Sequence, residues 1–322
     1  MVKILVFDTE TNDKPPDMPG KTWTERVKFG KNMLKFSEFL KENSLWDQFI
    51  QSWPSIIQLS YILYDTNNPK DAKIFNKYID IPDDIKITAE SMKIHHITKS
   101  KIKAASSLNK AKIYDALNEF MLDVSQADVV VAHNVQYDRK MIVAELTRLQ
   151  KNKKEFIPEI KAMMNDSHFD CTMEKTKSIC KLKKKFEYKD KKTGKQKYFY
   201  KMKLPKLIEA YNHFFGYEPN PDAMHDAIID AVICLRVYCI SQKKSKRFDV
   251  CGTNSIITDY ILKISPPGYS CCKKEDQYLD LDQDIILKKK NKNTKNNTNN
   301  NTNNNTNKKR KKTNNSKTKK QR

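Results

Sequence analysis

Short apolar segments recur along the first 240 residues, and their patterns predict strands and helices in a regular order. Residues 2–7 form an apolar run of strand length, and residues 54–65 and 73–81 are rich in β-branched and aromatic residues. The turn signal Asn67-Asn68-Pro69 separates the second segment from the third. The three segments therefore predict an antiparallel meander.

Helical periodicity dominates the part of the chain that follows the meander. The predicted elements are, in order, a helix over residues 110–125, a strand over 128–132, a helix over 137–149, a strand over 168–170 and helices over 205–215 and 226–240. A meander followed by alternating helices and strands predicts an α/β domain over residues 1–240, in which helices flank a mixed five-stranded sheet.

Two segments beyond this domain have a different character. Residues 241–287 show one short helical pattern at 256–264, and we find no candidate chemistry there. Residues 288–322 consist largely of Lys, Asn and Thr. Because they contain no apolar residues to offset the loss of chain entropy, we expect this basic tail to be disordered.

Positive charge is concentrated in two places along the chain. The 322 residues have a net charge of +22, and residues 288–322 contain fourteen Lys or Arg and no acid. Residues 175–206 contain fourteen Lys against Glu187 and Asp190, so the remainder is slightly acidic. A slightly acidic body with two basic appendages indicates a polyanionic partner such as a nucleic acid.

Nothing in the sequence predicts export or a membrane segment. No stretch approaches the roughly 20 apolar residues that span a bilayer, and the first apolar run ends at Asp8, too early for a signal-peptide core. The seven cysteines form no Cys-x-x-Cys pair, so we expect them to be reduced, with Cys234 and Cys239 in a core helix. We expect an intracellular protein without a membrane partner.

The first candidate site residues, Asp8 and Glu10, end the first predicted strand. Alternate side chains of a strand share a face, so the two carboxylates extend the row of Val2, Ile4 and Val6. For an isolated pair of this kind, a strand that meets solvent and turns is the favoured explanation. The pair therefore needs support from elsewhere in the chain.

Two further acids lie on the apolar stripes of predicted helices. Asp138 shares the stripe that continues through residues 141–149, and Asp230 shares the stripe that continues through residues 233–234. His225 stands where the second helix starts, and Asp226 is explained as a favourable charge at the amino end of that helix.

The four acids Asp8, Glu10, Asp138 and Asp230 stand at the ends of elements that pack side by side in a mixed sheet. Ionised carboxylates converge in a partly dry site only around cations, because they repel one another. Carboxylate ligands suit Mg²⁺ or Mn²⁺, and two such ions about 4 Å apart stabilise the attacking and leaving oxygens of a phosphoryl displacement.

In their order and separation these motifs resemble those of DEDDh exonucleases of the DnaQ-like, ribonuclease H-like superfamily. The resemblance extends from residue 2 to about residue 240. The matching motifs are Asp8-Thr9-Glu10-Thr11, Ala132-His133-Asn134 through Asp138, and His225-Asp226-Ala227 through Asp230. Further matches are Ile56-Ile57-Gln58-Leu59, His95-His96 (where the family often has Gly at the second position) and Leu204-Pro205-Lys206-Leu207.

The resemblance implies a two-metal nuclease site. It implies that the four acids bind two divalent ions, Mg²⁺ with Mn²⁺ as a substitute, and that His225 is the general base for the attacking water. It also implies cleavage in the 3′-to-5′ direction with release of nucleoside monophosphates, and we expect single-stranded 3′ ends as the partner. Thr11 and Asn134 would lie near the terminal nucleotide, although structural roles fit both equally. His133, His95 and His96 are interpreted as packing or loop residues.

Two insertions depart from the compact family pattern. Residues 11–53, helix-like after residue 32, are either a gate beside the metal site or an extra helix packed through Trp46 and Phe49. Residues 175–203 include a predicted hairpin that turns near Thr193-Gly194. Its lysines and rings either bind a single strand or serve solubility and anchoring. The candidate substrate-binding residues of the hairpin are Lys184, Lys185, Tyr188, Tyr198 and Tyr200.

The leading hypothesis is a metal-dependent 3′-to-5′ exonuclease acting on DNA, in proofreading or repair, with a DNA polymerase or repair assembly as partner. An RNA 3′ exonuclease is the alternative, because nothing identifies a reader of the 2′-hydroxyl. An inactive nucleic-acid-binding protein would have lost an acid or the histidine, and none is lost. A structural cation site would not need His225.

The bias toward Lys, Asn and Ile indicates an AT-rich genome, and similar chains occur in large DNA viruses. The cluster at 308–312 resembles a nuclear-localisation signal, although nonspecific attraction to nucleic acid or a solvated tail fits it equally. We therefore expect the protein in the nucleus or at a cytoplasmic site of viral replication.

Overall fold

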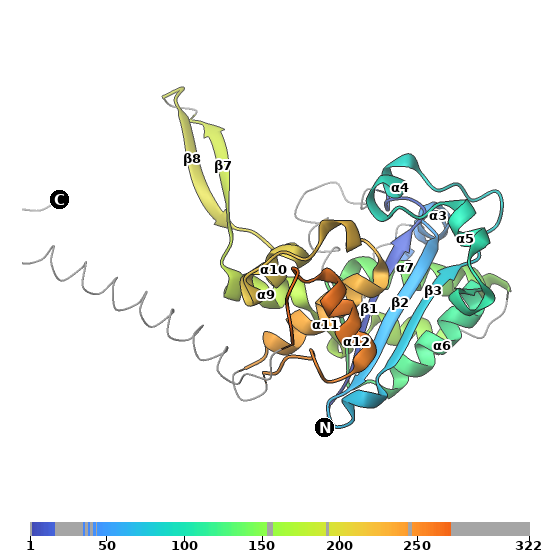
Figure 1. Ribbon diagram of the computed structural model, residues 1–322. Helices are drawn as coiled ribbons and strands as arrows, with labels where there is room; N and C mark the ends of the chain where they lie inside the picture. The colour runs from blue at the N-terminus through green and yellow to red at the C-terminus, as the bar shows by residue number, and fades with distance from the viewer. Residues whose placement is uncertain are drawn as a thin grey trace, which may run out of the picture. The chain divides into compact units, whose positions relative to one another are not determined.

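A six-stranded mixed sheet forms the centre of the fold (Figure 1). The computed structural model describes residues 2–16, 35, 38, 41–42, 44–152, 157–190, 193–243 and 247–271. The strands of this sheet are β1 (Lys3–Thr11), β2 (Ile56–Asp65), β3 (Lys73–Ile79), β4 (Lys110–Ala111), β5 (Val129–Ala132) and β6 (Phe169–Cys171). Their order across the sheet is β4-β3-β2-β1-β5-β6.

The strand directions confirm the predicted meander and correct the predicted number of strands. β1, β2 and β3 pair antiparallel, whereas β5 pairs parallel with β1 and β6 parallel with β5. The expected five strands are six, because Lys110–Ala111 forms β4, which pairs parallel with β3. The helix predicted from residue 110 begins at Ile113. A two-residue strand is too short to have a periodicity of its own.

Helices cover both faces of the sheet. The described helices are α3 (Trp46–Ser52), α4 (Ala89–His95), α5 (Lys99–Ala104), α6 (Ile113–Gln126), α7 (Val135–Asn152), α8 (Ile157–Met164), α9 (Thr172–Cys180), α10 (Leu207–Phe215), α11 (Ala227–Ile240) and α12 (Ser255–Ile264). Helices α4, α5, α8 and α9 were not predicted, because each has at most nine residues and few turns over which to show a stripe. None of the described helices is long and apolar enough to cross a membrane.

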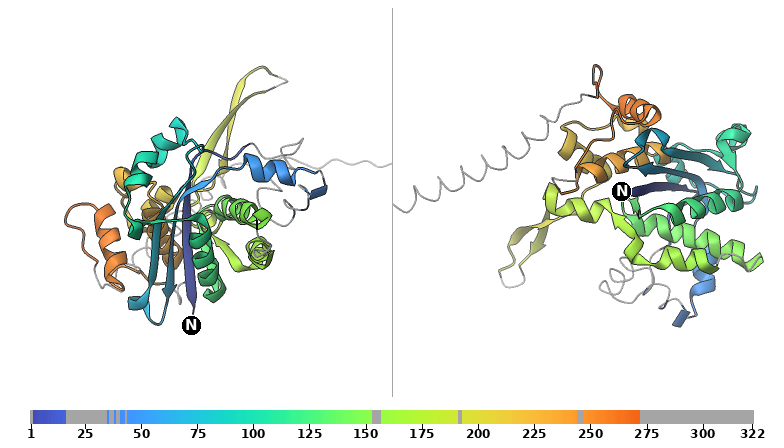
Figure 2. Two further views of the ribbon diagram at one scale, coloured as in Figure 1. Left: turned by 90° about the vertical axis from the view of Figure 1, so that its right-hand side faces the viewer. Right: turned by 90° about the horizontal axis from the view of Figure 1, so that it is seen from below.

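The two faces of β1 belong to two separate cores. Leu5 and Phe7 face α6 and α7, and the ring of Phe7 lies 5.2 Å from that of Phe120. Ile4 and Val6 face α11. Figure 2 shows the C-terminal helices, in orange, and α6 and α7, in green, on opposite sides of the sheet. The row of Ile4 and Val6 therefore leads its next members, Asp8 and Glu10, toward α11.

The predicted hairpin forms a separate two-stranded sheet. β7 (Lys183–Lys189) pairs antiparallel with β8 (Gln196–Met202), and the hairpin projects away from the body of the domain (Figure 1). Every residue of both strands is exposed. The interpretation that its rings anchor it to the body is therefore wrong.

The insertion over residues 11–53 ends in a helix that packs on the domain. Ile50 of α3 is fully buried, Trp46 is half-buried, and Arg148 of α7 donates a hydrogen bond of 3.0 Å to the carbonyl oxygen of Ile50. This agrees with the predicted packing through Trp46. The side chain of Phe49 and most of residues 17–43, which the gate interpretation concerns, lie outside the described residues.

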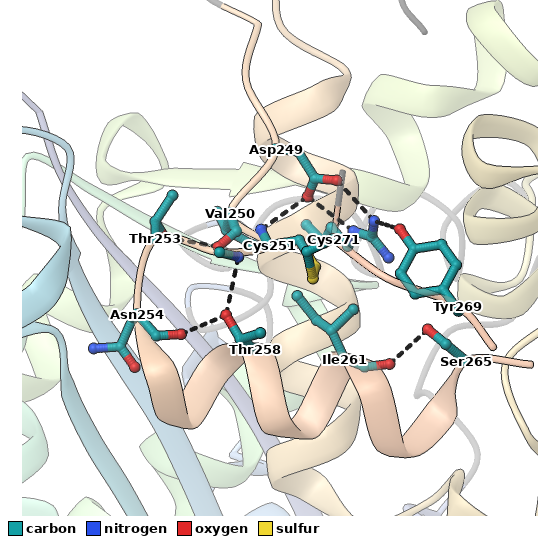
Figure 3. The surroundings of a disulfide bond; sticks show 12 residues. Asp249, Val250, Cys251, Thr253, Asn254, Thr258, Ile261, Ser265, Tyr269 and Cys271 are labelled. Carbon is teal, nitrogen blue, oxygen red and sulfur yellow. Dashed lines mark hydrogen bonds and ion pairs between the residues drawn. A yellow bond between two sulfur atoms is a disulfide. The ribbon is translucent and has the colours of Figure 1, made fainter. Parts of the chain in front are cut away.

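The C-terminal extension closes around a buried arginine of α11. Arg236 forms two hydrogen bonds with Asp249, of 2.9 and 2.7 Å, and donates a third, of 2.6 Å, to the hydroxyl of Tyr269. This fold-back brings Cys271 beside Cys251, and the two form a disulfide with a Cα separation of 5.5 Å (Figure 3).

The disulfide corrects the expectation that all cysteines are reduced. Cys251 and Cys271 are 20 residues apart, so no short-range spacing marks the pair. Cys234 and Cys239 are free and buried in α11, as predicted.

Candidate active site

The first two acids project from the carboxyl end of β1. Asp8 and Glu10 continue the alternate row of β1 that packs on α11, and both are half-buried. In the register with β2, Asp8 lies opposite Ser60 and Glu10 lies opposite Gln58. The strand period therefore places both carboxylates on the face predicted from the sequence.

Asp138 reaches the same end of β1 from the other face of the sheet. It lies in the first turn of α7 and is 3% exposed. Its Oδ1 accepts hydrogen bonds from the backbone N–H of Thr9, at 3.1 Å, and from the Thr9 hydroxyl, at 2.8 Å. Thr9, between the two acids of β1, thus fixes the third carboxylate beside them. Its role was not predicted from the sequence.

His225 and Asp230 come from the start of α11. His225 has a positive φ of 61° and is followed by the N-cap residue Asp226. The positive φ is uncommon for a residue with a side chain and marks a local turn into the helix. Asp230 lies one turn into α11 and is 8% exposed. The ligating atoms of Glu10, His225 and Asp230 lie within 4.8 Å of one another.

Gln58 ties β2 to the start of α11. Its side chain is 1% exposed; Nε2 donates hydrogen bonds of 2.9 Å to Asp226 and 3.0 Å to Asn76, and Oε1 accepts one of 3.4 Å from the backbone N–H of Ala227. Asp226 is therefore a fifth carboxylate beside the cluster rather than only a favourable helix-end charge. The match at residues 56–59 was the sequence signal for this contact, but it did not reveal the partner.

All four carboxylates of the cluster have a raised pKa. Burial is the largest cause for all four acids, and the pKa values of Asp8 and Glu10 rise well above their ordinary values because neighbouring carboxylates add repulsion. Burial raises the pKa of Asp138 to about 7. Burial and then the charge of Asp226 raise the pKa of Asp230 to about 7. Divalent cations would neutralise this repulsion.

The pKa of His225, unlike those of the four acids, is lowered. Partial desolvation, followed by the nearby charges of His96 and Lys206, lowers the pKa of the His225 imidazole. Near neutral pH the ring is therefore mostly neutral, the form that accepts a proton. A neutral imidazole within reach of clustered carboxylates is suited to general-base chemistry.

A cleft of about 530 Å³ opens beside His225 and Asp230. Asn134, which is exposed and has a φ of 67°, lies in its wall. The remaining lining residues are mainly apolar and come from the turn before Asn134, from α9 and α10, and from the segments before α10 and α11; they are His133, Met173, Leu204, Pro205, Lys206, Leu207, Ile208, Pro221 and Met224. The cleft has room for a ligand next to the acids.

The hydroxyl of Thr11 is buried and hydrogen-bonded within the protein, so it is not available to a ligand in the cleft. Thr11 is 5% exposed, and its hydroxyl donates a hydrogen bond of 2.7 Å to the carbonyl oxygen of Asp13. The hydroxyl also lies 3.4 Å from that of Tyr137. These contacts favour the structural role over contact with a nucleotide.

The other histidines are packing or loop residues, as predicted. The two ring nitrogens of His133 contact the Thr172 hydroxyl, at 2.9 Å, and the Pro205 carbonyl, at 3.1 Å. His95 is buried and lies 3.2 Å from the carbonyl oxygen of Thr11. His96 ends α4 with a φ of 56°, a conformation that glycine adopts readily.

The five hairpin residues predicted to bind substrate do not form one surface. The register of β7 and β8 places Lys184 and Tyr188 on one face, and Lys185, Tyr198 and Tyr200 on the other. All five are exposed, so they are open to a partner.

Comparison with known families adds independent support for this fold. The family model RNase_T, described as "Exonuclease", matches residues 51–238, more than half of the chain. The match begins after β1, so the assignment of Asp8 and Glu10 to the site rests on the structure alone and not on the family match. No curated protein sequence matches the chain.

Solved nuclease structures match the chain at low similarity. E. coli Exonuclease I in complex with a dT13 oligonucleotide has 12% identity and a TM-score of 0.44, over 76% of this chain and 42% of that chain. The cell-death related nuclease CRN-4 has 13% identity and a TM-score of 0.34, over 73% of this chain and 62% of that chain. The chain spans about four tenths of the length of Exonuclease I. By its family match and its mixed sheet, this chain belongs to the RNase_T exonuclease family, with a DnaQ-like, ribonuclease H-like fold.

Proposed function

We propose that this chain is a divalent-metal-dependent 3′-to-5′ exonuclease that hydrolyses the terminal phosphodiester of DNA and releases nucleoside 5′-monophosphates. The observation that carries the proposal is the convergence of acids from β1, α7 and α11 beside a partly desolvated histidine. Repulsion among buried carboxylates is unfavourable unless cations compensate it. A site that keeps all of these acids is therefore built for a charged cofactor.

The residues present fit a pair of divalent ions. Oδ1 of Asp230 is buried and has no hydrogen-bond partner in the described part of the chain, so one ligating oxygen is unsatisfied. The carboxylate donors suit Mg²⁺, with Mn²⁺ as a substitute. We assign the ions to Asp8, Glu10, Asp138 and Asp230. When bound, they would neutralise charge on the phosphate and on the attacking and leaving oxygens.

The remaining chemistry falls to side chains of this chain. His225 accepts the proton of the attacking water at a ring nitrogen, because its lowered pKa favours the neutral ring near pH 7. Gln58 orients Asp226 and the start of α11, which presents both His225 and Asp230. Asn134 and the apolar wall of the cleft receive the terminal nucleotide.

An RNA 3′ exonuclease is the second candidate. The same acids and histidine would serve either nucleic acid, since the reacting phosphodiester is common to both. The described residues of the cleft include no side chain that we can assign to the 2′-hydroxyl. We therefore retain DNA as the proposed substrate and make RNA an arm of the test.

The test uses the purified chain with single-stranded DNA and RNA labelled at the 3′ end. We expect labelled mononucleotide to be released from DNA with Mg²⁺ or Mn²⁺ and not with EDTA. Asp8→Ala should abolish release, because it removes a central ligand, whereas Asp115→Ala, at an exposed position on α6, should leave the rate unchanged. Equal release in EDTA, or full activity of the Asp8→Ala variant, would refute the metal mechanism. Faster cleavage of RNA than of DNA would favour the alternative.

A further inference from the structure

The exposed hairpin has two chemically different faces. A two-stranded hairpin is marginally stable by itself in water, yet β7 and β8 place six lysines and five aromatic rings on fully exposed strands. We call one side the phenylalanine face; its residues are Lys184, Phe186, Tyr188, Lys197, Phe199 and Lys201. We call the other side the tyrosine face; its residues are Lys183, Lys185, Glu187, Lys189, Gln196, Tyr198, Tyr200 and Met202.

The phenylalanine face contains uncompensated positive charge. Lys184 and Lys201 lie directly opposite each other in the ladder, and no carboxylate among the described residues pairs with either. Like charges in directly opposed positions destabilise a β-ladder. On the tyrosine face, by contrast, each lysine lies opposite an uncharged residue, and Lys185 also pairs with Glu187 at 2.6 Å. An anion between Lys184 and Lys201 would turn this repulsion into binding.

The rings of the phenylalanine face lie beside these lysines. The rings of Phe186 and Phe199 lie 5.5 Å apart with an interplanar angle of 12°, and the Nζ atom of Lys201 lies 5.1 Å from the Phe199 centroid. The exposed fractions of the two residues are 38% and 39%. Partly exposed rings beside cations can stack bases while the cations contact phosphates.

The hairpin begins and ends at the cleft described above. The backbone N–H of Lys203, which directly follows β8, bonds to the carbonyl oxygen of Leu182, which precedes β7. The next residues, Leu204 and Pro205, line the cleft beside His225. Phe199 lies five residues before Leu204, at most about 17 Å along an extended chain at ~3.3 Å per residue.

We propose that the phenylalanine face of the hairpin binds the single strand behind its 3′ end. A phosphate lies between Lys184 and Lys201, and neighbouring bases stack on Phe186 and Phe199. The direction of the bound strand, with its 3′ end in the cleft, rests on the proposed nuclease function. The phenylalanine face thereby forms a second contact, specific to longer substrates and separate from the catalytic acids.

The charge of the hairpin favours a nucleic acid over a second copy of the hairpin as the partner that binds the phenylalanine face. The two strands carry six lysines and a single acid, Glu187, so two such surfaces would repel each other. A polyanion with flat bases complements both the charges and the rings.

The ring test is a binding measurement on the full chain in EDTA, so it does not depend on catalysis. Fluorescence anisotropy with a DNA single strand of about 30 nucleotides should show at least tenfold weaker binding for the F186A/F199A and F186L/F199L double variants. F186W/F199W should bind as wild type, because it keeps the stacking faces. Y198A/Y200A, matched on the tyrosine face, should lose less than threefold. Wild-type affinity of the leucine variant would overturn the stacking role.

A second pair of variants tests the charges. K184A/K201A should reduce the slope of log Kd against log salt by about 0.7, the contribution of the one phosphate of a single strand that the two lysines contact together. K183A/K189A removes the same charge from the tyrosine face and should change the slope by less than half as much. Equal changes would overturn the choice of face. Loss of self-association in F186A/F199A, with nucleic-acid affinity retained, would assign the surface to a second copy.

Hydrolysis of a trinucleotide separates the two proposals. With its terminal nucleotide in the cleft, such a substrate leaves only two nucleotides for the hairpin, so its cleavage reports mainly the metal site. If the wild-type chain binds long strands through the phenylalanine face but does not cleave the trinucleotide or longer DNA, the nuclease proposal fails and the binding surface stands. If it cleaves both and the hairpin variants bind normally, only the inference about the hairpin fails.

Discussion

Replacing Asp230 with Asn should make the metal-free protein more stable while it abolishes nuclease activity. The substitution keeps the shape of the side chain and removes one charge from a buried cluster whose members repel one another. A residue selected for metal binding is expected to destabilise the metal-free fold in this way.

The magnitude follows from the raised pKa of Asp230, about 7 in the folded protein against 3.8 as the ordinary value. A carboxyl with a raised folded-state pKa favours the folded state below pH 3.8, and that contribution is lost as the pH rises through 7. Above pH 7, where Asp230 is ionised in both states, the shift corresponds to a destabilisation of the folded state by about 4 kcal/mol, at ~1.4 kcal/mol per pKa unit. Neighbouring carboxylates share this destabilisation, so removing one charge relieves only part of it. We therefore expect Asp230→Asn to stabilise the folded state by about half of this amount, ~2 kcal/mol.

Thermal unfolding in EDTA measures the effect. At about pH 8 the Asp230→Asn variant should melt roughly 4–8 °C above the wild type, and near pH 4.5 the difference should shrink to less than about 1 kcal/mol. Mg²⁺ should raise the melting temperature of the wild type more than that of the variant. Asp115→Asn, at an exposed position on α6, is the control and should change neither curve. A variant that melts below the wild type by the same amount at both pH values would refute the reasoning.

Three further changes test other parts of the account. Gln58→Leu releases the side chain of Asp226 and should lower kcat about tenfold with little change in KM, as measured by steady-state cleavage of single-stranded DNA. Asp249→Ala leaves the guanidinium of Arg236 buried without its carboxylate and should lower the free energy of unfolding in urea by about 3 kcal/mol; an unchanged midpoint would contradict this. Cys251→Ser opens a 20-residue loop and should cost about 3 kcal/mol of stability under oxidising conditions. Under reducing conditions the wild type should match that variant.

The sequence predicted the parts of the site that follow from local periodicity. The strand period placed Asp8 and Glu10 on one face, and the helical stripe placed Asp138 inward, because both depend only on side-chain direction within one element. The helical pattern also placed His225 where α11 starts, and the structure agrees with it.

Long-range pairings were not predictable in the same way. The hydrogen bond from Thr9 to Asp138 joins residues 129 positions apart, and the bond from Gln58 to Asp226 joins residues 168 positions apart. Neither partner has a distinctive local pattern. The disulfide of Cys251 depends on a fold-back around α12, and no spacing rule predicts it.

The hairpin shows a third kind of limit. Its turn was predicted correctly, and the sequence left open whether its rings are exposed or anchored to the body. The five residues chosen from sequence mixed its two faces. Strand register decides which side chains share a face, and a shift of one residue reverses them. Only the pairing of Lys184 with Lys201 reveals where the opposed charges lie.

Diffraction from crystals grown with Mn²⁺ and a nucleoside monophosphate tests the central claim most directly. The account predicts two anomalous peaks about 4 Å apart, both within ligating distance of Asp8, with Glu10, Asp138 and Asp230 completing the two sites. Peaks that lie away from these carboxylates, or a cluster that binds no Mn²⁺ under these conditions, would contradict it.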